Sequence, residues 1–556
     1  GTTDLKSHGF FANWEPKENY NLCTPGGDKS KVDAFMRFMD SNEKILICTH
    51  ATLRFAFEQI DESKFDNCLL AIDEFHHVSA DKETSRLGTL LHSIMTKSSA
   101  HVVAMTGSYF RGDGKPVLLP EDEEKFSKVT YNYYEQLNGY THLKSLGIGY
   151  HFYQGRYTSA IAEVLDTDKL IVLPGCIDTQ VHFREPGSTD AEDLNSGSKA
   201  AVMGGITSVF EMPNTNPPTT NFEEFDKKIQ IGKGMFCNHA FYFGATAENY
   251  STLEKLKDLK GCCGIKLFAG SSTGNLLVDK EKDIEKVFEH ASKVVAVHSE
   301  DEEILKIRKK LIEEGNVLSH PIWRNEEVAM SSTRRIVKIA KRLNKRAHIL
   351  HITTKEEVDF LSQNKGLITF EITPQHLTIY SPNCYDKLGT YAQMNPPIRD
   401  KSHYDRLWYA VRNNLNDTIG SDHAPHLKVN KDKEYPNSPS GMPGVQTIMP
   451  VMLNHVNDGK LSLNQLISFV CENPIKIFGI KNKGFIREGF DADFTIVDMN
   501  KKIIIKNENI ESKCRWSPFN EIEFKGTPVA TIIAGKTKMK DGKILGDPDG
   551  TPLKFN

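Results

Sequence analysis

The sequence predicts an α/β protein whose larger part is a (β/α)8 barrel and whose first part is a smaller α/β unit. From Leu170 onward, eight short apolar runs recur with helical stretches between several of them, an alternation typical of a helix-covered parallel sheet. Polar and titratable residues gather at the ends of these runs, as they do at the carboxyl ends of barrel strands. A doubly wound sheet would also fit the alternation, but the count of eight and the polar run ends favour the barrel.

The eight runs are the predicted strands of the barrel. In chain order they are LIVLPGCIDTQVHF (170–183), ITSVFEMPN (206–214), AFYFGATAE (240–248), GCCGIKLFAGSS (261–272), VVAVHSE (294–300), AHILHITT (347–354), GLITFEITP (366–374) and DTIGSDHAP (417–425). The stretches 283–293 and 330–344 carry apolar residues at helical spacing and are predicted to be amphipathic helices between strands.

The first part of the chain, residues 1–168, contains three further apolar runs that end in acidic residues or in Thr, Gly and Ser. They are KILICTHATL (44–53), CLLAIDEFHH (68–77) and HVVAMTGSYFRGD (101–113). Buried strands with such ends indicate a parallel sheet with a site at its carboxyl edge. The pattern resembles the first motor domain of a superfamily-two (DEAD/DExH-like) helicase, a RecA-like α/β domain. That resemblance implies a Mg²⁺ and water-activating box at Asp73, Glu74 and His76 and a coupling motif at residues 106–108.

Two features argue against a working motor in this part. No GxxxxGK[ST] motif occurs, so the phosphate cradle is missing. Too few residues precede position 169 for a second motor domain with its arginine finger. We therefore expect a partial, inactive helicase-like domain. The simpler alternative is a set of ordinary strand ends with solvated acidic residues.

Composition narrows the expected partners. The formal net charge of −4 gives no overall basic signal for nucleic acid. No apolar run approaches the roughly 20 residues that span a bilayer, and the first residues lack the basic and then apolar pattern of a signal peptide. The 10 cysteines form no CxxC pair, which fits a reducing compartment. We expect a cytoplasmic protein that acts on a small molecule, with a homodimer as a candidate assembly.

The predicted strand ends carry a set of candidate metal ligands. The residues at these ends are Gln180, His182, Arg184, Asn214, Lys266, His298, His351, Asp422, His423 and His426. In a barrel they point to one mouth, where imidazoles and a carboxylate from different strands can converge on a cation such as Zn²⁺. A single histidine at a strand end is more often a hydrogen-bonded structural residue, but five such positions together favour a shared metal site.

Lys266 needs a separate explanation, because an ammonium group is not a metal ligand and its burial beside a dication would be very costly. If the amine reacts with CO₂, the resulting carbamate is equivalent to a carboxylate and can bridge two metals. That reaction needs the neutral amine, which a cationic site of low dielectric supplies by lowering the pKa of Lys266.

From about Lys169 to the C-terminus the chain resembles a class I dihydroorotase of the amidohydrolase superfamily. The motifs that carry the resemblance are PGCIDTQVHFREPG, EMPNTNP, GIKLFAGSSTG, AVHSED, HILHITT, EITPQHL, QMNPPIR, IGSDHAPH and SGMPGVQT, and after them NPIKIFGI, KGFIREGFDADFTIVD, RWSPF and TIIAGKTKMKDGKI. The resemblance implies an amidohydrolase-type TIM barrel over residues 169–480 and part of a β-sandwich over residues 481–556, preceded by the helicase-like part over residues 1–168.

The resemblance also implies the roles of the site residues. His182 and Asp422 would hold one zinc ion, His298 and His351 the other, and carboxylated Lys266 would lie between them. Arg184, Asn214, Asn395 and His426 would bind the substrate, with Arg184 paired to its carboxylate and the backbone of the SGMPG loop gripping the ring amides. Asp422 would shuttle the proton while hydroxide opens dihydroorotate to N-carbamoyl-aspartate, a step of pyrimidine biosynthesis.

Two departures from the family pattern shape the expectation. Gln180 stands where the first histidine of an H-x-H pair is usual, and a neutral carbonyl is a weaker ligand than imidazole, so one or two metals per chain are expected. The helicase-like part occupies the place of the family's first sandwich strands, so FTIVD (494–498) and VATIIAG (529–535) should have open apolar edges. The alternatives are another cyclic amidase, such as a dihydropyrimidinase or allantoinase, a non-catalytic dihydroorotase-like scaffold, and a nucleic-acid motor.

Overall fold

The computed structural model describes residues 18–23, 28–72, 86–104, 170–271 and 276–556. The chain divides into two compact units, Gly1–Lys144 and Ser145–Asn556. Each unit has its own hydrophobic core. Among the described residues, no helix is both long and apolar enough to cross a membrane.

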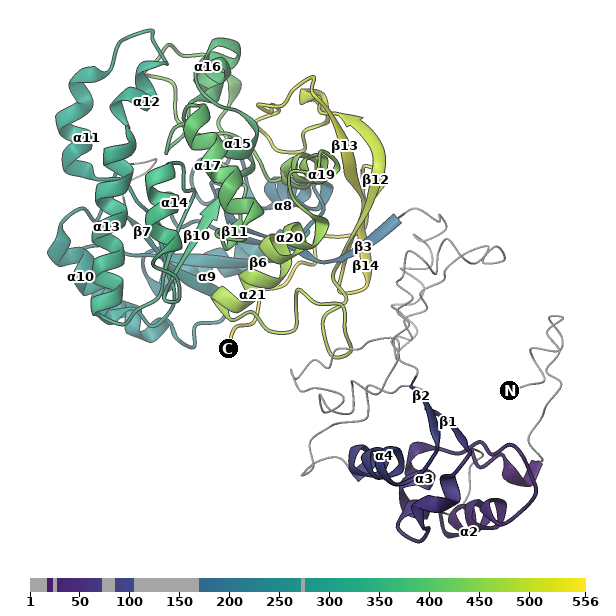
Figure 1. Ribbon diagram of the computed structural model, residues 1–556. Coiled ribbons are helices and arrows are strands. Elements are labelled where there is room, and N and C mark those ends of the chain that lie inside the picture. Colours follow the sequence, from purple (N-terminus) through teal and green to yellow (C-terminus); the bar gives the residue numbers. More distant parts are fainter. Residues whose placement is uncertain (1–17, 24–27, 73–85, 105–169, 272–275) are drawn as a thin grey trace. The chain divides into compact units, whose positions relative to one another are not determined.

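The described part of the first unit is a small α/β structure (Figure 1). Its elements are η1 (Glu18–Tyr20), α2 (Asp28–Met39), α3 (His50–Phe57), η2 (Glu62–Phe65), β1 (Leu69–Ile72), α4 (Arg86–Lys97) and β2 (His101–Ala104). Strands β1 and β2 pair in parallel, as the sequence predicts. Helices α2, α3 and α4 contribute Phe35, Leu53, Ala56 and Ile94 to its core.

The predicted strand over residues 44–53 is wrong. Ile47 makes only an isolated bridge with Asn21, and helix α3 begins at His50. Thr49 caps that helix by accepting a hydrogen bond from the backbone NH of Thr52, which is the usual function of a threonine before the first turn. The predicted Asp73, Glu74 and His76 box and the 106–108 motif lie outside the described residues.

The second unit contains the predicted (β/α)8 barrel. Its parallel strands are β4 (Cys176–Val181), β5 (Ile206–Glu211), β6 (Asn238–Gly244), β7 (Cys262–Phe268), β8 (Val295–His298), β9 (Ala347–Ile349), β10 (Ile368–Ile372) and β11 (Thr418–Ile419). They are hydrogen-bonded in that order. Val181 and His423 close the circle through an isolated bridge, in which the backbone NH of His182 donates to the His423 carbonyl at 2.8 Å. Each of the eight predicted runs therefore contains a barrel strand, although the first of these strands is shorter than its run.

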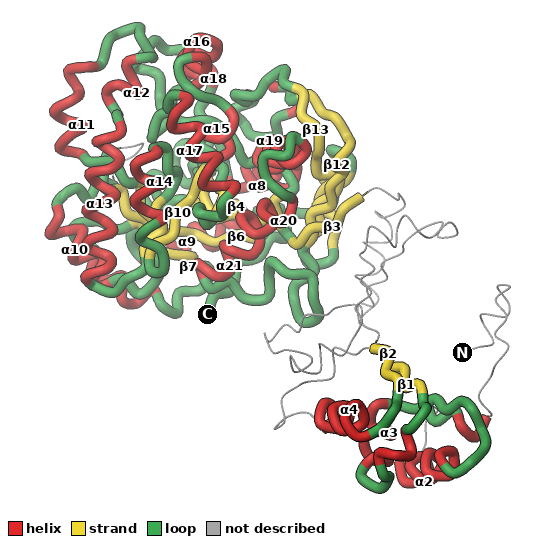
Figure 2. The backbone as a smooth tube through the Cα atoms, in the orientation of Figure 1, coloured by secondary structure: helices red, strands yellow, loops and turns green. Residues whose placement is uncertain are grey.

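Helices cover the outside of the barrel (Figure 2). They are α8 (Leu194–Met203), α9 (Phe222–Ile231), α10 (Glu281–His290), α11 (Glu302–Arg308), α12 (Ser319–Trp323), α13 (Glu326–Arg342), α14 (Lys355–Ser362), α15 (Pro374–Thr378), α16 (Asn383–Leu388), α17 (Lys401–Arg412), α18 (Lys428–Lys431), α19 (Ile448–Asn457), α20 (Leu463–Ile467) and α21 (Asn473–Phe478). The longest, α13, begins at the Asn325 cap, carries Glu326 and Glu327 in its first turn, and ends on Lys341 and Arg342, which complement the helix dipole.

The run predicted as the first barrel strand is in fact two strands. Residues Leu170–Pro174 form β3, which pairs with another sheet, and the barrel strand β4 starts only at Cys176. Gly175 makes the break, because a Cβ there would lie 2.5 Å from Thr207 Oγ1 and 2.7 Å from Asp493 Cβ. The apolar letters continue through the break, so the pattern alone could not show it.

The other sheet of this unit has five antiparallel strands. Besides β3 they are β12 (Phe494–Ile504), β13 (Glu523–Ile533), β14 (Lys536–Lys540) and β15 (Lys543–Ile544), in the order β15-β14-β13-β12-β3. The sheet lies beside α8 and α19 in Figure 1. The expectation of open edges at 494–498 and 529–535 is wrong, because β12 pairs with both β3 and β13, and β13 with both β12 and β14. Among the described residues, β3 and β15 are the edge strands of this sheet, and Ile171 of β3 is 37% exposed.

Candidate metal centre

The strand ends bring all five predicted metal ligands to one pocket. His182 directly follows β4, Lys266 lies within the last three residues of β7, and His298 ends β8. His351 and Asp422 follow β9 and β11. The pocket is lined by Gln180, His182, Lys266, Phe268, His298, His351, Asn395, Asp422, Ala424, Ser440 and Gly441. The predicted ligands are all buried. The convergence predicted from five separate stretches of sequence is therefore present in the fold.

His182 and Asp422 form one side of the centre. His182 Nε2 lies 3.3 Å from Asp422 Oδ1. The other ring nitrogen, Nδ1, lies 2.8 Å from Asn214 Oδ1. Because an amide oxygen can only accept, Nδ1 carries the proton and Nε2 keeps its lone pair toward the pocket. Asn214, predicted to bind substrate, thus orients a candidate metal ligand in this structure.

His298 and His351 form the other side. Nδ1 of His298 lies 3.1 Å from Nε2 of His351, so the two ring nitrogens face the same point. The outer nitrogen of His298, Nε2, donates to Glu300 Oε2 at 2.8 Å, and Arg324 forms an ion pair with the same carboxylate at 3.2 Å. A carboxylate behind an imidazole fixes its tautomer and raises its basicity, which is the usual support of a metal-binding histidine.

Gln180 has one unsatisfied polar atom in this pocket. Its Nε2 donates to Asp422 Oδ1 at 2.8 Å, while its Oε1 is buried and, within the part of the chain that the structure describes, accepts no hydrogen bond. A buried acceptor without a partner is costly. A cation among Gln180, His182 and Asp422 would satisfy that oxygen, so the residues present fit a metal at this position.

Lys266 is fully buried beside these ligands. Its Nζ lies over the Phe268 ring, 4.5 Å from the centroid, and it forms no ion pair with a described residue. Burial lowers the pKa of Lys266 to about 7, against the opposing effect of the Asp422 carboxylate. A large fraction of the amine is therefore neutral near pH 7, as reaction with CO₂ requires.

Without Lys266, the His, Cys, Asp and Glu side chains of the described residues do not form a complete metal site. In the described ranges, no group of three or more His, Cys, Asp or Glu side chains is placed to hold a metal. The four such ligands fall instead into the His182–Asp422 pair and the His298–His351 pair. A carboxylated Lys266 would supply the ligand that both pairs lack.

Three of the predicted site residues have a strained backbone. Arg184, His351 and Asp422 adopt left-handed conformations, with φ of 62°, 38° and 45°. Such conformations cost about 1–3 kcal/mol each in non-glycine residues and cluster at functional sites. Arg184 lies three residues after β4, His351 two residues after β9 and Asp422 three residues after β11, where the chain turns at the barrel mouth.

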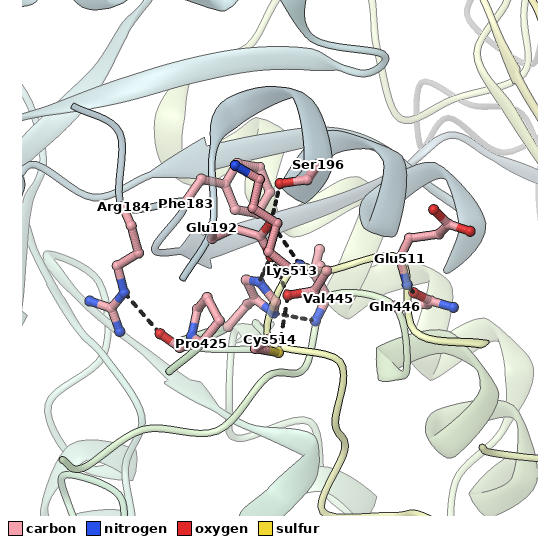
Figure 3. Close-up of polar contacts among 12 residues, drawn as sticks. Phe183, Arg184, Glu192, Ser196, Pro425, Val445, Gln446, Glu511, Lys513 and Cys514 are labelled. Carbon is pink, nitrogen blue, oxygen red and sulfur yellow. Dashed lines mark hydrogen bonds and ion pairs between the residues drawn. The ribbon is translucent and has the colours of Figure 1, made fainter. Parts of the chain in front are cut away.

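The predicted substrate-binding residues lie close to the metal ligands. Arg184 is buried, its Nε donates to the Pro425 carbonyl at 3.2 Å (Figure 3), and its Nη2 lies 3.3 Å from His426 Nε2. Burial lowers the pKa of Arg184 to about 10, so the guanidinium stays charged at neutral pH. Asn395 lines the pocket, and its Oδ1 lies 3.0 Å from Nε2 of the buried His320.

Sequence reasoning missed the residues that support the ligands. Glu300 and Arg324 hold His298, and Arg324 also donates to the backbone carbonyl of Ser271, close to Lys266 in the chain. A signal for Glu300 was present, because it stands two residues after His298 and alternate residues of an extended chain share a side. Arg324 gave no signal, since it precedes a helix far from the barrel motifs in sequence.

The two parts of the chain are similar to different known proteins. The model of the amidohydrolase family matches residues 171–538. The dihydroorotase of Methanosarcina acetivorans is 34% identical over 399 residues, which cover 69% of this chain and 85% of that protein. The dihydroorotase of Pyrococcus abyssi is 34% identical over 381 residues, covering 68% and 86%.

A solved structure and a third relative are also similar to parts of this chain. The L-hydantoinase (dihydropyrimidinase) from Arthrobacter aurescens superposes with a TM-score of 0.67 at 28% identity, covering 70% of this chain and 89% of that one. The first part of the chain is similar to a putative ATP-dependent helicase, YeeB of Bacillus subtilis, with 70% identity over 171 residues. The aligned residues make up 31% of this chain and only 28% of YeeB.

Proposed function

The chain belongs to the amidohydrolase family, and on that basis we propose that it is a zinc-dependent dihydroorotase acting in pyrimidine biosynthesis in the cytoplasm. Its dihydroorotase and hydantoinase relatives make it a cyclic amidohydrolase. The observation that carries the finer proposal is the convergence of His182, Lys266, His298, His351 and Asp422 on one pocket with a buried guanidinium beside it.

We propose that these five residues, with Lys266 carboxylated, hold one or two zinc ions. The buried acceptor of Gln180 and the two facing imidazoles support this assignment. When bound, the metal would lower the pKa of a water molecule to about 7 and polarise the ring carbonyl under attack. Gln180 remains the weakest donor of the set, so the position shared by His182 and Asp422 is proposed to hold its metal less tightly.

The remaining steps belong to the chain's own residues. Asp422 accepts the proton of the attacking water and returns it to the ring nitrogen that leaves. Burial raises the pKa of Asp422 to about 7, which brings a carboxyl group close to the operating pH, where proton transfer is most effective. Arg184 and His426 hold the substrate carboxylate, and Asn395, which lines the pocket, contacts the ring.

The second candidate is a hydantoinase-like or dihydropyrimidinase-like activity, which the structural likeness to L-hydantoinase supports. Such substrates need no guanidinium for a ring carboxylate. Arg184 beside the pocket and the dihydroorotase relatives at 34% identity favour dihydroorotate. We propose no part in the reaction for residues 1–168, because all of the candidate site residues lie between Gln180 and Gly441.

Arg184→Lys tests the choice between these substrates. Lysine keeps the charge but loses the planar pair of donors, and a lost hydrogen bond to a charged group costs about 1.5–3 kcal/mol, or about 10–100-fold in kcat/KM for dihydroorotate. Inhibition by dihydrouracil, a ring without the carboxylate, should not change. Steady-state kinetics with both compounds measure this. An equal loss with both would reject the assignment of Arg184 to the carboxylate.

A further inference from the structure

The C-terminal strap, defined here as residues 509–516, runs between β12 and β13 and contacts the barrel mouth. It touches two parts of the barrel that flank the candidate site: Glu192, just before α8, and the segment 423–446 after β11. Figure 3 shows Glu511, Lys513 and Cys514 of the strap beside Glu192, Ser196, Val445 and Gln446. The proposed reaction steps use none of these contacts.

Glu192 is the central acceptor of this region. It is fully buried. Its carboxylate accepts hydrogen bonds from the hydroxyls of Ser196 and Ser512 and from the backbone NH of Lys513 at 3.3 Å. It also lies 3.3 Å from His423 Nε2. Two of these four partners come from the strap, so the strap supplies half of the donors that stabilise a buried carboxylate.

His423 connects Glu192 to the loop that lines the pocket. Its Nδ1 accepts from the backbone NH of Gly444 at 3.0 Å and of Val445 at 3.4 Å. Because Nδ1 accepts, the proton is on Nε2, which faces Glu192. The loop 440–444, whose Ser440 and Gly441 line the pocket, is therefore tied through His423 and Glu192 to the strap.

Two further contacts tie the strap to the same wall. Trp516 Nε1 donates to the carbonyl of His426 at 2.8 Å. The side chain of Gln446 accepts from the Glu511 backbone NH at 2.9 Å and donates to the Asn509 carbonyl at 2.8 Å. Both ends of the segment that carries His426 and the loop 440–444 are thus fixed to the strap.

Apolar packing and hydrogen bonds both hold this wall. Met442 of the loop belongs to one buried hydrophobic cluster with Cys514 and Trp516 of the strap. A small cavity lies beside the loop, lined by Gly444, Thr447, Ile510, Ser512 and Trp516. Since interiors are normally close-packed, this space gives the loop room to shift when its hydrogen bonds to the strap are lost.

We propose that the C-terminal strap is a positioning element that sets the substrate-facing wall of the pocket, and that it governs substrate affinity rather than the chemical step. This rests on the proposed function for its kinetic consequence. Three of the five candidate metal ligands, Lys266, His298 and His351, lie on or after β7, β8 and β9, outside the segment that the strap contacts. The other two adjoin His423: Asp422 precedes it in the chain, and the backbone NH of His182 donates to its carbonyl at 2.8 Å.

The test combines Trp516→Phe with Ser512→Ala, which removes two hydrogen bonds and keeps most of the packing. The indole bond is neutral and the bond to the Glu192 carboxylate is charge-assisted, so their joint loss should raise KM for dihydroorotate about tenfold while kcat and bound metal stay near wild type. Amide hydrogen exchange over residues 440–446 should become faster. The matched control is Trp408→Phe. Trp408 lies on α17, is buried, and donates from its indole NH to the Leu377 carbonyl at 2.9 Å. This variant should change neither KM nor the exchange over residues 440–446.

The outcomes separate this proposal from the proposed function. Unchanged exchange over residues 440–446 would overturn it, and so would a fall in kcat and metal content at constant KM. If the wild-type chain does not turn over dihydroorotate, the proposed function fails, and the exchange measurement still decides the positioning role. Faster exchange in the double variant, with none in Trp408→Phe, supports the strap as the element that holds this wall.

Discussion

Asp422→Asn is expected to lower kcat by about 10²–10⁴-fold, the usual contribution of a general acid–base group. The amide keeps the shape of the side chain but cannot accept the proton of the attacking water or return it to the leaving nitrogen. It also removes the charge that faces His182 Nε2 at 3.3 Å, so bound metal should fall as well. Turnover and metal content of the purified variant measure both effects.

The matched control for this variant lies on the same strand. Asp417, just before β11, binds Lys365 at 2.5 Å and the backbone NH of Phe370 at 2.9 Å, at the far end of the strand from the pocket. Asp417→Asn removes a carboxylate without touching the site and should keep near-wild-type turnover. Unchanged turnover in Asp422→Asn would remove the proton shuttle from the mechanism.

Lys266→Ala should abolish turnover. It should also lower metal affinity by more than the 10–100-fold that typically follows loss of a residue hydrogen-bonded to a metal ligand. The reason is geometric: without the carboxylated lysine, the His182–Asp422 and His298–His351 pairs have no shared anionic ligand. Metal analysis and kinetics check this. Small carboxylic acids added to the variant should restore part of the activity, because they can occupy the space of the missing carbamate.

Lys266→Arg is the informative companion to that variant. Arginine keeps a cation at the position but cannot form the carbamate, since its guanidinium stays protonated. It should be as inactive as Lys266→Ala. If Lys266→Arg retained both metal and turnover, the lysine would act only as a buried cation and the carboxylated form would be wrong.

Much of the barrel and its mouth could be predicted because the signals are local. Each strand is an apolar run with a functional residue at its end, so His298 and His351 could be assigned from a few neighbouring letters. Where local signals conflict, the prediction was wrong. The apolar stretch 170–183 hides the break at Gly175, a position where Thr207 and Asp493 leave no room for a Cβ.

The supporting contacts could not be predicted because they join distant parts of the chain. Ser512 reaches Glu192 across 320 positions, and Trp516 reaches His426 across 90. Arg324 likewise reaches Ser271 across 53 positions. No periodicity links such residues, since their approach depends on how the finished barrel brings its ends together. The helix that begins at His50 shows a different limit of sequence-based prediction. The apolar run there favours a strand, but Thr49 caps a helix.

The most direct measurement is turnover of dihydroorotate by the purified chain before and after removal of its metal. A chelator should abolish ring opening, and added Zn²⁺ should restore it in proportion to bound metal, with one tight metal per chain and a second, weaker one at the Gln180 position. Mass spectrometry under mild conditions should find an added carboxyl group on Lys266. Full turnover by the metal-free chain, or none by the zinc-loaded chain, would contradict the assignment of this pocket as a dihydroorotase site.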